Sequence, residues 1–570
     1  MSKPKVYIIG VGMTKFEKPG RRENFDYPQM AVESVTKALQ DAKINLQKVD
    51  QACVGYVYGD STCGQRALYE IGMTGIPVYN VNNNCSTGSS ALYLGKQIIE
   101  SQNADCVLVF GFEKMESGSL SSKFFDRTNP MDKHVTLMGD LVGLDASPFT
   151  AQLFGNAALE YMKKNNVKPE TLAKIAYKNH KHSVNNPYSQ FQKEYSLNEI
   201  MESPKVFGPL TKLQCCPTSD GSAAAILASE RFVVQNNLQD QAVEIIGMEM
   251  ATDPPSTFSG RTCVQIVGYD MTKLAADKLF SKTDIKPKDV DVVELHDCFS
   301  ANELITYEAL GLCEQGKAGE FIESGANTYG GQVVVNPSGG LISKGHPLGA
   351  TGIAQCSELY WQLLGKADKR QVSGAKIALQ QNIGLGGAVV VALYKKGFPN
   401  FSQTSQKVSI NPKTDKDPTV FKVYKVFKIL EEAMLEDKEN LIERVRGIYC
   451  FKVINSSGKE GMWIINAKTG KGSVTFYGTG NLYKFKSLIS KTIPILKYVL
   501  NNNLLVIGKP DVTFTMKDDD VVELISGKLN PQKAFFQGKI KIQGNMGLAL
   551  KLVELQKLMS HKIAELRSKL

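Results

Sequence analysis

The most informative segment of this chain is Asn80–Leu92, which reads NVNNNCSTGSSAL. A polar turn leads into Cys85, and a helix-forming run, Ser86–Ser101, begins directly after it. This order predicts a cysteine at a helix N-terminus, where unpaired backbone N–H groups and the helix dipole favour a thiolate. A cysteine at the start of a helix is by itself more often structural, so the segment needs support from elsewhere in the sequence.

A second segment supplies a candidate base. Gly339–Gly352 reads GGLISKGHPLGATG and places His346 between a glycine-rich turn and a proline. Glycine at this density lets the backbone approach a ligand closely. A neutral imidazole there would accept the proton of the Cys85 thiol, whereas the alternative is a histidine that only holds its own turn.

Two further segments follow apolar, strand-like runs. Val292–Glu303, VVELHDCFSANE, places His296, Asp297 and Cys298 between a buried strand and a helix, where α/β proteins tend to carry functional groups. Gln380–Val391, QQNIGLGGAVVV, has a glycine-rich turn between two apolar runs. The backbone N–H groups of such a turn can face an oxyanion.

The first part of the chain alternates strand-like and helical patterns, which indicates an α/β architecture with a largely buried sheet. The clearest predicted helix is Tyr27–Lys43, with Asp26 as its N-cap and Pro28 in its first turn. Lys395–Thr419, rich in Pro, Ser, Thr, Asn and Lys, is predicted to be a linker. Strand-like and helical patterns return beyond it and predict a small α+β domain over 421–570.

Composition narrows the class of protein. The chain has 570 residues, of which 42% are hydrophobic, as is usual for soluble globular proteins. Its net charge is +10, and the basic character belongs to the C-terminal domain, which from Phe421 onward has 25 Lys and Arg against 14 Asp and Glu. Such a surface favours anionic partners such as CoA phosphates or membranes, or is only a solvated face. We expect no nucleic-acid partner.

The cysteines and the apolar runs bear on the compartment. Eleven cysteines are scattered without a CxxC pair, which predicts free thiols in a reducing compartment. No apolar run reaches the length of about 18 residues that a transmembrane helix needs. The short apolar run near the N-terminus indicates a first buried strand rather than a secretory signal.

Together, the four segments resemble the thiolase superfamily, and within it the thiolases of the sterol carrier protein X family. Two more stretches match, KNHKHSVNNPYSQF at Lys178–Phe191 and CCPTSDGSAAAI at Cys215–Ile226. The resemblance implies a five-layer αβαβα fold of two similar halves. These are 1–240, with an inserted loop domain that contacts CoA, and 241–395, followed by a linker over 396–420. Homodimers are usual in the family.

The resemblance also assigns catalytic roles. Cys85 matches the acylated nucleophile, and His346 matches the base that activates it. Better-known thiolases carry a second cysteine in a CxG motif, where this chain has NIG at Asn382–Gly384. They carry NEAF where this chain has HDCF at His296–Phe299. In the sterol-carrier type, the cysteine of HDCF, here Cys298, is taken to supply the missing acid or base.

Oxyanion roles follow from the same resemblance. His296 replaces the family asparagine and would help to hold one oxyanion. A second oxyanion site is assigned to Gly384 and Asn382. Gly384 would act through its backbone N–H group, together with the backbone N–H group of Cys85. An enolate leaving group needs such stabilisation at its oxygen.

No metal and no cofactor are implied, and CoA enters as a co-substrate. His180 and His182 are two residues apart, but no Cys or carboxylate pattern accompanies them. We therefore expect them to be loop residues rather than metal ligands.

The C-terminal domain resembles the lipid-binding domain of sterol carrier proteins. The matching stretches are GMWIINAKTGKGSV at Gly461–Val474 and SGKLNPQKAFFQGKIKIQGNMGLALKL at Ser526–Leu552. The family fold encloses an apolar tunnel for fatty acids, fatty acyl-CoA or sterols. The expected lipid-binding residues, each of which is otherwise an ordinary core residue, are Phe535, Phe536, Gln537 and Met546.

The end of the sequence carries two more signals. Leu548–Leu566 has apolar residues at helical spacing, typical of core packing or of a cover for the tunnel mouth. The last residues are Ser568, Lys569 and Leu570, which match a peroxisomal address read by an import receptor. We therefore expect a peroxisomal protein.

Three functions remain in competition. The first is a peroxisomal 3-oxoacyl-CoA thiolase of β-oxidation, with 2-methyl-branched or sterol side-chain substrates, that releases acetyl-CoA or propanoyl-CoA and also binds and transfers lipid. The second is a non-catalytic lipid carrier that uses the thiolase region as a scaffold, which the missing CxG cysteine favours. The third is a condensing ketosynthase, which the HDCF cysteine disfavours.

Overall fold

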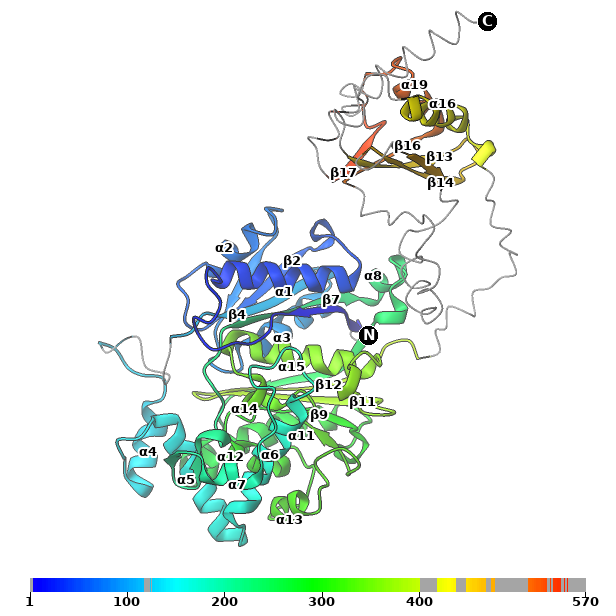
Figure 1. Ribbon diagram of the computed structural model, residues 1–570. Helices are drawn as coiled ribbons and strands as arrows, with labels where there is room; N and C mark the ends of the chain where they lie inside the picture. Colours follow the sequence, from blue (N-terminus) through cyan, green and yellow to red (C-terminus); the bar gives the residue numbers. More distant parts are fainter. Residues whose placement is uncertain are drawn as a thin grey trace, which may run out of the picture. The chain divides into compact units, whose positions relative to one another are not determined.

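The structure of the chain is a computed structural model (Figure 1). The chain divides into two compact units, Met1–Gln406 and Lys407–Leu570. Most of the predicted linker and of the predicted final helix lies outside the described residues. The structure describes residues 4–116, 124, 126–399, 418–436, 447–467, 473–476, 511–530, 534, 537–544, 548 and 551.

The large unit is built on one mixed sheet of ten strands, in the order β10-β9-β11-β12-β8-β1-β7-β4-β2-β3. Several strands, such as β1 and β4, are buried along their whole length because helices cover both faces. The strands are β1 Val6–Met13, β2 Gln51–Gly55, β3 Val78–Val81, β4 Cys106–Glu113, β7 Gly221–Ser229, β8 Val243–Ala251, β9 Val292–Glu294, β10 Val334–Val335, β11 Ile377–Gly384 and β12 Ala388–Lys396.

The sheet repeats one pattern of strand pairing twice. In the first half, β2 pairs in parallel with β3 and β4, and β7 pairs antiparallel with β4 and β1. In the second half, β9 pairs in parallel with β10 and β11, and β12 pairs antiparallel with β11 and β8. The halves meet where β1 and β8 pair antiparallel. The predicted α/β fold of two similar halves is confirmed.

Helices cover both half-sheets and separate them. Helix α1 packs on β1 and β7, and α11 packs on β8 and β12. Between the halves lie α3 and α15, which contact each other and strands of both halves (Figure 1). The resulting order is the αβαβα layering that the resemblance implied. The helices are α1 Tyr27–Ala42, α3 Thr87–Glu100, α11 Tyr269–Ser281 and α15 Leu348–Leu363.

Local sequence explains features of three of these helices. The predicted helix Tyr27–Lys43 is confirmed as α1, and the Asp26 carboxylate accepts a hydrogen bond from the backbone N–H of Tyr27. Helices α3 and α15 approach closely because both carry glycine at the crossing. A Cβ atom on Gly88 would lie 2.8 Å from the carbonyl oxygen of Gly349, which is closer than packed atoms tolerate.

An insertion between β4 and β7 forms a separate group of helices beside the second half-sheet (Figure 1). It consists of α4 Asp132–Val142, α5 Phe149–Asn165, α6 Pro169–Ser183, α7 Leu197–Glu202 and the small hairpin of β5 Lys205–Phe207 and β6 Leu210–Thr211. The remaining helices of the large unit are α2 Cys63–Tyr69, α8 Glu230–Gln235, α9 Ser256–Ser259, α10 Cys263–Ile266, α12 Ser300–Ala309, α13 Ala318–Glu323 and α14 Gly340–Lys344.

The small unit has a sheet of five strands in the order β15-β14-β13-β16-β17. Its core is rich in aromatic side chains, with Trp463 in contact with Phe421 and Phe476. Asp518 accepts hydrogen bonds from the backbone N–H groups of Lys422 and Val423 and so holds the start of α16. The elements are α16 Val423–Glu436, β13 Ile448–Ile454, β14 Glu460–Asn466, β15 Ser473–Phe476, β16 Val512–Lys517, α19 Asp518–Ile525 and β17 Lys541–Gly544.

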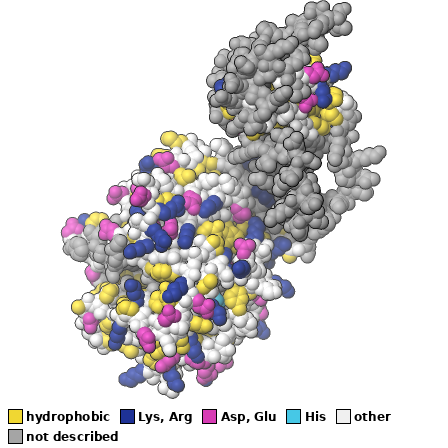
Figure 2. Space-filling model, in the orientation of Figure 1, with side chains coloured by type: hydrophobic (Ala, Val, Ile, Leu, Met, Phe, Trp, Pro, Cys, Tyr) yellow, Lys and Arg dark blue, Asp and Glu magenta, His cyan; other side chains and the backbone are white. Residues whose placement is uncertain are grey.

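Two further observations concern the surface. None of the helices in the described ranges has both the length and the apolar character needed to cross a membrane. Basic and acidic side chains are interspersed over the face of the large unit that Figure 2 shows. This distribution agrees with the nearly balanced charge of the sequence before Phe421.

Candidate active site

The four segments singled out in the sequence meet at one cavity of about 340 Å³ in the large unit. Its wall includes Cys85 from the turn after β3, His296 and Cys298 from the loop after β9, and His346 from the turn before α15. Ile383 at the end of β11 and Leu385 in the β11–β12 turn complete this part of the wall. The structure therefore brings the predicted nucleophile, base and second thiol into a shared pocket.

The turn that carries Cys85 is fixed by its neighbours. Asn84 has a positive φ of 50°, a conformation that asparagine adopts more readily than most residues. Its side-chain nitrogen donates to the Leu385 carbonyl oxygen at 3.0 Å. Ser86 occupies the N-cap position of α3 and its hydroxyl donates to the Asn83 carbonyl oxygen. Cys85 therefore lies just before the helix, as predicted.

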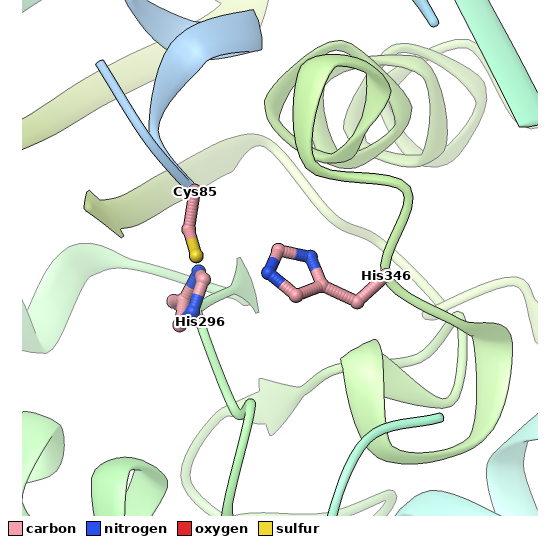
Figure 3. A group of neighbouring side chains, drawn as sticks. All are labelled: Cys85, His296 and His346. Atoms are coloured by element: carbon pink, nitrogen blue, oxygen red, sulfur yellow. The ribbon is translucent and has the colours of Figure 1, made fainter. Parts of the chain in front are cut away.

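The polar side-chain atoms of three residues face one another across the cavity (Figure 3). The sulfur of Cys85 and one ring nitrogen each of His296 and His346 all lie within 4.8 Å of one another. The two imidazole rings are nearly perpendicular, at 88°, with their centroids 5.1 Å apart. Proton transfer between the thiol and an imidazole therefore needs only a small side-chain movement.

His346 is held by its backbone and by one side of its ring. Its N–H group donates to Ser219 Oγ at 3.0 Å, and Nδ1 lies 2.7 Å from Thr351 Oγ1. Its Nε2 is buried and has no hydrogen-bond partner within the described part of the protein. In Figure 3, this nitrogen points toward Cys85. The arrangement suits a base that accepts the proton of the Cys85 thiol.

Burial sets the protonation states of the pair. It raises the pKa of Cys85 to about 12, and the carboxylate of Glu113 adds to the shift. It lowers the pKa of His346 to about 3. At neutral pH both groups are uncharged. The prediction of a thiolate at the helix start is thus corrected, because loss of hydration outweighs the helix dipole here.

Cys298 shares the cavity with a neighbour that sequence reasoning missed. Cys298 is buried, and burial raises the pKa of its thiol well above the usual value, with Cys216 and Cys85 adding to the shift. The backbone N–H of Cys216 donates to the Cys298 carbonyl oxygen at 2.8 Å, and Cys215 and Cys216 also line the cavity. Their signal was present in the matching stretch Cys215–Ile226.

Asn382 and Gly384 are placed differently from the sequence prediction. Neither belongs to the cavity wall, so the expected direct oxyanion roles do not follow from their positions. The side-chain nitrogen of Asn382 instead lies 2.9 Å from Nδ1 of His296. Gly384 packs against the nucleophile turn, where a Cβ atom would lie 2.2 Å from the Asn83 carbonyl oxygen. Asn382 thus supports His296, and Gly384 supports the turn that carries Cys85.

The expectation of loop positions for His180 and His182 is wrong, since both lie in α6. His180 uses Nδ1 for Ser343 Oγ and Nε2 for the Leu213 carbonyl oxygen, both at 3.0 Å. His182 contacts the Asn336 carbonyl oxygen and Thr328 in the same way. Protein groups therefore occupy all four ring nitrogens, and these histidines pack α6 onto the second half of the unit.

The rest of the cavity wall is mainly apolar. The rings of Phe154 and Phe299 stack with their centroids 5.1 Å apart, which joins the insertion to the loop that carries Cys298. A wall of this kind suits a hydrocarbon chain better than a polar substrate. The apolar side chains contributed from the insertion side include Met115, Met131, Phe149, Phe154, Phe191 and Val206.

Among the expected lipid-binding residues, only Gln537 belongs to the described part of the chain, where it is exposed in a turn. Phe535, Phe536 and Met546 lie outside the described residues. The terminal residues Ser568–Leu570 also lie outside them.

Comparison with protein families accounts for both units. The thiolase N-terminal domain matches residues 6–231, and the thiolase C-terminal domain-like family matches 261–394. The SCP-2 sterol transfer family matches 501–557. The chain resembles solved thiolases in fold, including human mitochondrial 3-ketoacyl-CoA thiolase with a TM-score of 0.52 and 20% identity over 69% of this chain and 99% of that one.

Similar proteins match either nearly the whole chain or about two thirds of it. The sterol carrier protein 2 of Oryctolagus cuniculus is 56% identical over 97% of this chain and 96% of its own. The protein of the same name from Homo sapiens is 55% identical, also over 97% and 96%. An acetyl-CoA acetyltransferase of Methanothermobacter thermautotrophicus is 33% identical over 69% of this chain and 99% of its own. The chain therefore belongs to the two-domain sterol carrier protein family, as an acyltransferase of the thiolase type joined to an SCP-2 lipid-binding domain.

Proposed function

We propose that this chain cleaves 3-oxoacyl-CoA esters with CoA in peroxisomal β-oxidation. The observation that carries this proposal is the approach of Cys85, His296 and His346 to within 4.8 Å in a cavity with mainly apolar walls. A nucleophile, a base and a second thiol at Cys298 are the groups that a retro-Claisen cleavage requires.

The proposed reaction assigns each step to a cavity residue. Nε2 of His346 takes the proton of Cys85, and the sulfur forms a bond to the 3-keto carbon. The C2–C3 bond then breaks, and its electron pair forms the enolate of the shorter acyl-CoA. Cys298 donates a proton to that enolate carbon, while His296 stabilises the oxyanion. The proton held by His346 then returns to the Cys298 thiolate. Neutral His346 takes the thiol proton of free CoA, whose sulfur attacks the acyl-enzyme, and the bond from the acyl carbon to Cys85 breaks. His346 gives its proton to the departing Cys85 sulfur, which regenerates the Cys85 thiol.

The proposed substrates include 2-methyl-branched or sterol side-chain 3-oxoacyl-CoA esters. The cavity wall near Phe154 and Phe299 is mainly apolar, although Lys212 also lines the cavity, and a methyl group buried against the apolar part gains about 0.8 kcal/mol. Cleavage of a 2-methyl substrate would release propanoyl-CoA, and cleavage of a straight chain would release acetyl-CoA. Rates on matched straight and 2-methyl-branched substrates measure this preference.

Replacement of the nucleophile tests the central proposal. We expect Cys85→Ala to remove CoA-dependent cleavage of a 3-oxoacyl-CoA, measured by loss of substrate absorbance and by product chromatography. Cys313→Ala is the matched control, because Cys313 is also a free, half-buried cysteine and does not line the cavity. Full activity of the Cys85 variant would end the proposal.

The small unit is proposed to bind and transfer fatty acids, fatty acyl-CoA or sterols. Its match to the SCP-2 sterol transfer family and its apolar core support this role. The alternative of a lipid carrier without catalysis keeps one supporting observation, the asparagine at position 382 in place of a cysteine. Lipid transfer by the full chain together with undetectable thiolysis by the unmodified protein would favour this alternative.

The proposed state is a homodimer formed through the large unit. Strand β3 is an edge strand whose Tyr79 is 43% exposed, and Tyr69 and Met73 nearby in sequence are 51% and 78% exposed. Exposed apolar side chains next to an unpaired strand edge favour association with a second copy. Sedimentation of the full chain against Tyr79→Lys tests this interface.

The peroxisomal location is proposed from the residues Ser568, Lys569 and Leu570. An import receptor reads this sequence as an address. Removal of Leu570 should leave a fluorescent fusion of the chain in the cytosol, whereas the intact fusion should collect in peroxisomes.

A further inference from the structure

The two cavity histidines, His296 and His346, have different hydrogen-bond partners, and this difference separates their roles. We propose that Asn382 and Ser89 are positioning residues that fix the single proton of His296 on Nε2, so that its ring donates a hydrogen bond into the cavity. The proposal rests on the thiolase chemistry above, in which a carbonyl oxygen gains negative charge beside Cys85.

The hydrogen-bond chain begins at a backbone carbonyl, which can only accept. One terminal atom of the Gln380 side chain lies 2.7 Å from the Gly352 carbonyl oxygen. That atom must be the amide nitrogen, so Oε1 points the other way. There it accepts a hydrogen bond from the Tyr394 hydroxyl at 2.5 Å. The orientation of the Gln380 amide is therefore fixed at both ends.

Gln380 in turn determines which neighbour the Ser89 hydroxyl donates its proton to. Its Nε2 also donates to Ser89 Oγ at 3.0 Å, so the serine proton remains available for another acceptor. That acceptor is Oδ1 of Asn382, at 2.9 Å. All three side chains are fully buried, and an amide turned the wrong way would leave a buried donor without an acceptor, which is costly.

The orientation of the Asn382 amide determines which ring nitrogen of His296 carries the proton. Its Nδ2 lies 2.9 Å from Nδ1 of His296, and an amide N–H group can only donate. Nδ1 must therefore be the bare nitrogen, which places the proton on Nε2. Burial lowers the pKa of His296 well below its usual value, with a further contribution from His346, so the ring is neutral.

His346 has the reverse arrangement. Thr351 Oγ1 donates its proton to the Pro347 carbonyl oxygen at 3.0 Å, so it accepts from Nδ1 of His346 at 2.7 Å. The proton of His346 is thus on Nδ1, and the buried Nε2 is bare. One ring can take the thiol proton, and the other can offer a proton to an oxyanion (Figure 3).

The same contact joins the two positions at which this chain departs from the motifs of the better-known thiolases. Asn382 stands where those enzymes have the cysteine of CxG, and His296 stands where they have the asparagine of NEAF. In this chain the two side chains are hydrogen-bonded to each other. A histidine at position 296 needs a donor behind it, and the residue at 382 supplies one.

The variant Asn382→Asp tests the proposal with almost no change of shape. A carboxylate keeps the bond from Ser89 but accepts from Nδ1 of His296, which moves the single proton off Nε2. We expect kcat at pH 8 to fall about 10²-fold with little change in KM, the size of effect seen when one oxyanion donor is removed. Alkylation of Cys85 by iodoacetamide should keep its rate, because His346 is untouched.

A lower pH should partly restore the kcat of the Asn382→Asp variant. As the pH falls, either the ring gains a second proton or the new carboxyl group becomes protonated, and in both cases Nε2 regains its proton. The ratio of variant to unmodified kcat should therefore rise from pH 8 to pH 5.5. A purely structural defect would give a ratio that does not depend on pH.

Two further variants keep the test decisive. Ser89→Ala leaves the Asn382 amide free to turn, and we expect about a tenfold loss of kcat with normal Cys85 alkylation. Asn327→Asp is the matched control for a buried carboxylate, because Asn327 is buried and bonds to Tyr307 away from the cavity. It should show no recovery in acid.

The results separate failure of this inference from failure of the proposed function. If the unmodified chain cleaves 3-oxoacyl-CoA but Asn382→Asp has its full kcat and an unchanged pH profile, the inference is overturned. If Asn382→Asp does not fold, an unmodified kcat in Ser89→Ala overturns it instead. An unmodified chain that cleaves no 3-oxoacyl-CoA contradicts the proposed function itself.

Discussion

The two halves of the large sheet share one topology but contribute different chemistry. In the first half, the connection from β3 to α3 carries Cys85, and in the second half, the equivalent connection from β10 to α15 carries His346. Because α3 and α15 pack against each other, the two connections reach the same cavity. A repeated fold therefore places two helix starts face to face, and one is specialised as nucleophile and the other as base.

The equivalent connections also differ in how they are held. The nucleophile turn is short and depends on Asn84 and on close packing against Gly384. The base lies after a longer connection that contains α14, whose start is held by the Asp297 carboxylate through the backbone N–H groups of Leu341 and Ile342 at 2.6 and 3.2 Å. The comparison predicts that changes at the two chemical groups cost most, and changes at their supports cost less.

Removal of the base should have the largest effect after loss of the nucleophile itself. We expect His346→Ala to lower kcat by about 10³-fold, within the usual range for a general base. Since burial raises the pKa of Cys85 to about 12, its alkylation in this variant should rise about tenfold for each pH unit from 7 to 10. The unmodified chain should show a nearly flat profile, because His346 takes the proton. Matching profiles would contradict the pairing.

Removal of the second thiol should lower the rates of the two half-reactions by different amounts. Cys298→Ala is expected to lower the rate of full cleavage by about 10²-fold, because the enolate loses its proton donor. Transfer of a preformed acyl group from Cys85 to CoA should be affected less, which rapid-quench measurement of the two half-reactions would show. Cys313→Ala again serves as control. An equal loss in both half-reactions would assign Cys298 a different role.

The contact between the halves at the nucleophile turn can be altered directly. A Cβ atom at residue 384 would lie 2.2 Å from the Asn83 carbonyl oxygen and 3.0 Å from the Ser86 backbone nitrogen. Gly384→Ala should displace this turn, destabilise the unit by about 1–3 kcal/mol and lower kcat. Gly139→Ala, at a helical position in α4 where the nearest atom to a new Cβ would be 3.6 Å away, is the comparison for thermal unfolding. Equal midpoints for the two variants would show that the turn can adjust.

The support of the base should give the smallest effect. Asp297→Asn keeps one acceptor oxygen but turns an amide toward a backbone donor, so we expect a loss of about 1–2 kcal/mol in the free energy of unfolding. The His346 ring is held separately by Thr351, so kcat should fall by less than in the preceding variants. A loss of kcat as large as that of His346→Ala would show that α14 controls the base directly.

Much of this site was predictable from the sequence, because its main groups sit in recognisable local contexts. Cys85, His296 and His346 each belong to a distinctive short segment. The protonation of Cys85 was not predictable, since it depends on how deeply the folded protein buries the thiol. The partnership of Asn382 with His296 was also missed, because the two residues are 86 positions apart in sequence and the orientation of the buried amide depends on Ser89.

The fold was predictable to the level of its layers and its two halves, but not in every detail. Alternating apolar runs gave the sheet, and the capped pattern at Asp26 gave α1. His180 and His182 were expected in a loop, although they lie in a helix whose start is marked by Pro169. Their polar neighbours in sequence resemble a loop, whereas the helix is marked by Pro169 and by the buried apolar residues of its first turns, such as Leu172 and Ile175.

Asp518 has a consequence for any proteolytic release of the small unit. Its carboxylate binds the backbone N–H groups of Lys422 and Val423, far away in sequence. A cut before Pro418 would free a fragment that keeps this clasp, whereas a cut beyond Val423 would remove both donors and leave a buried carboxylate bare. The first residue that a liberated lipid carrier can have is thus set by a side chain 95 positions beyond Val423 in the sequence.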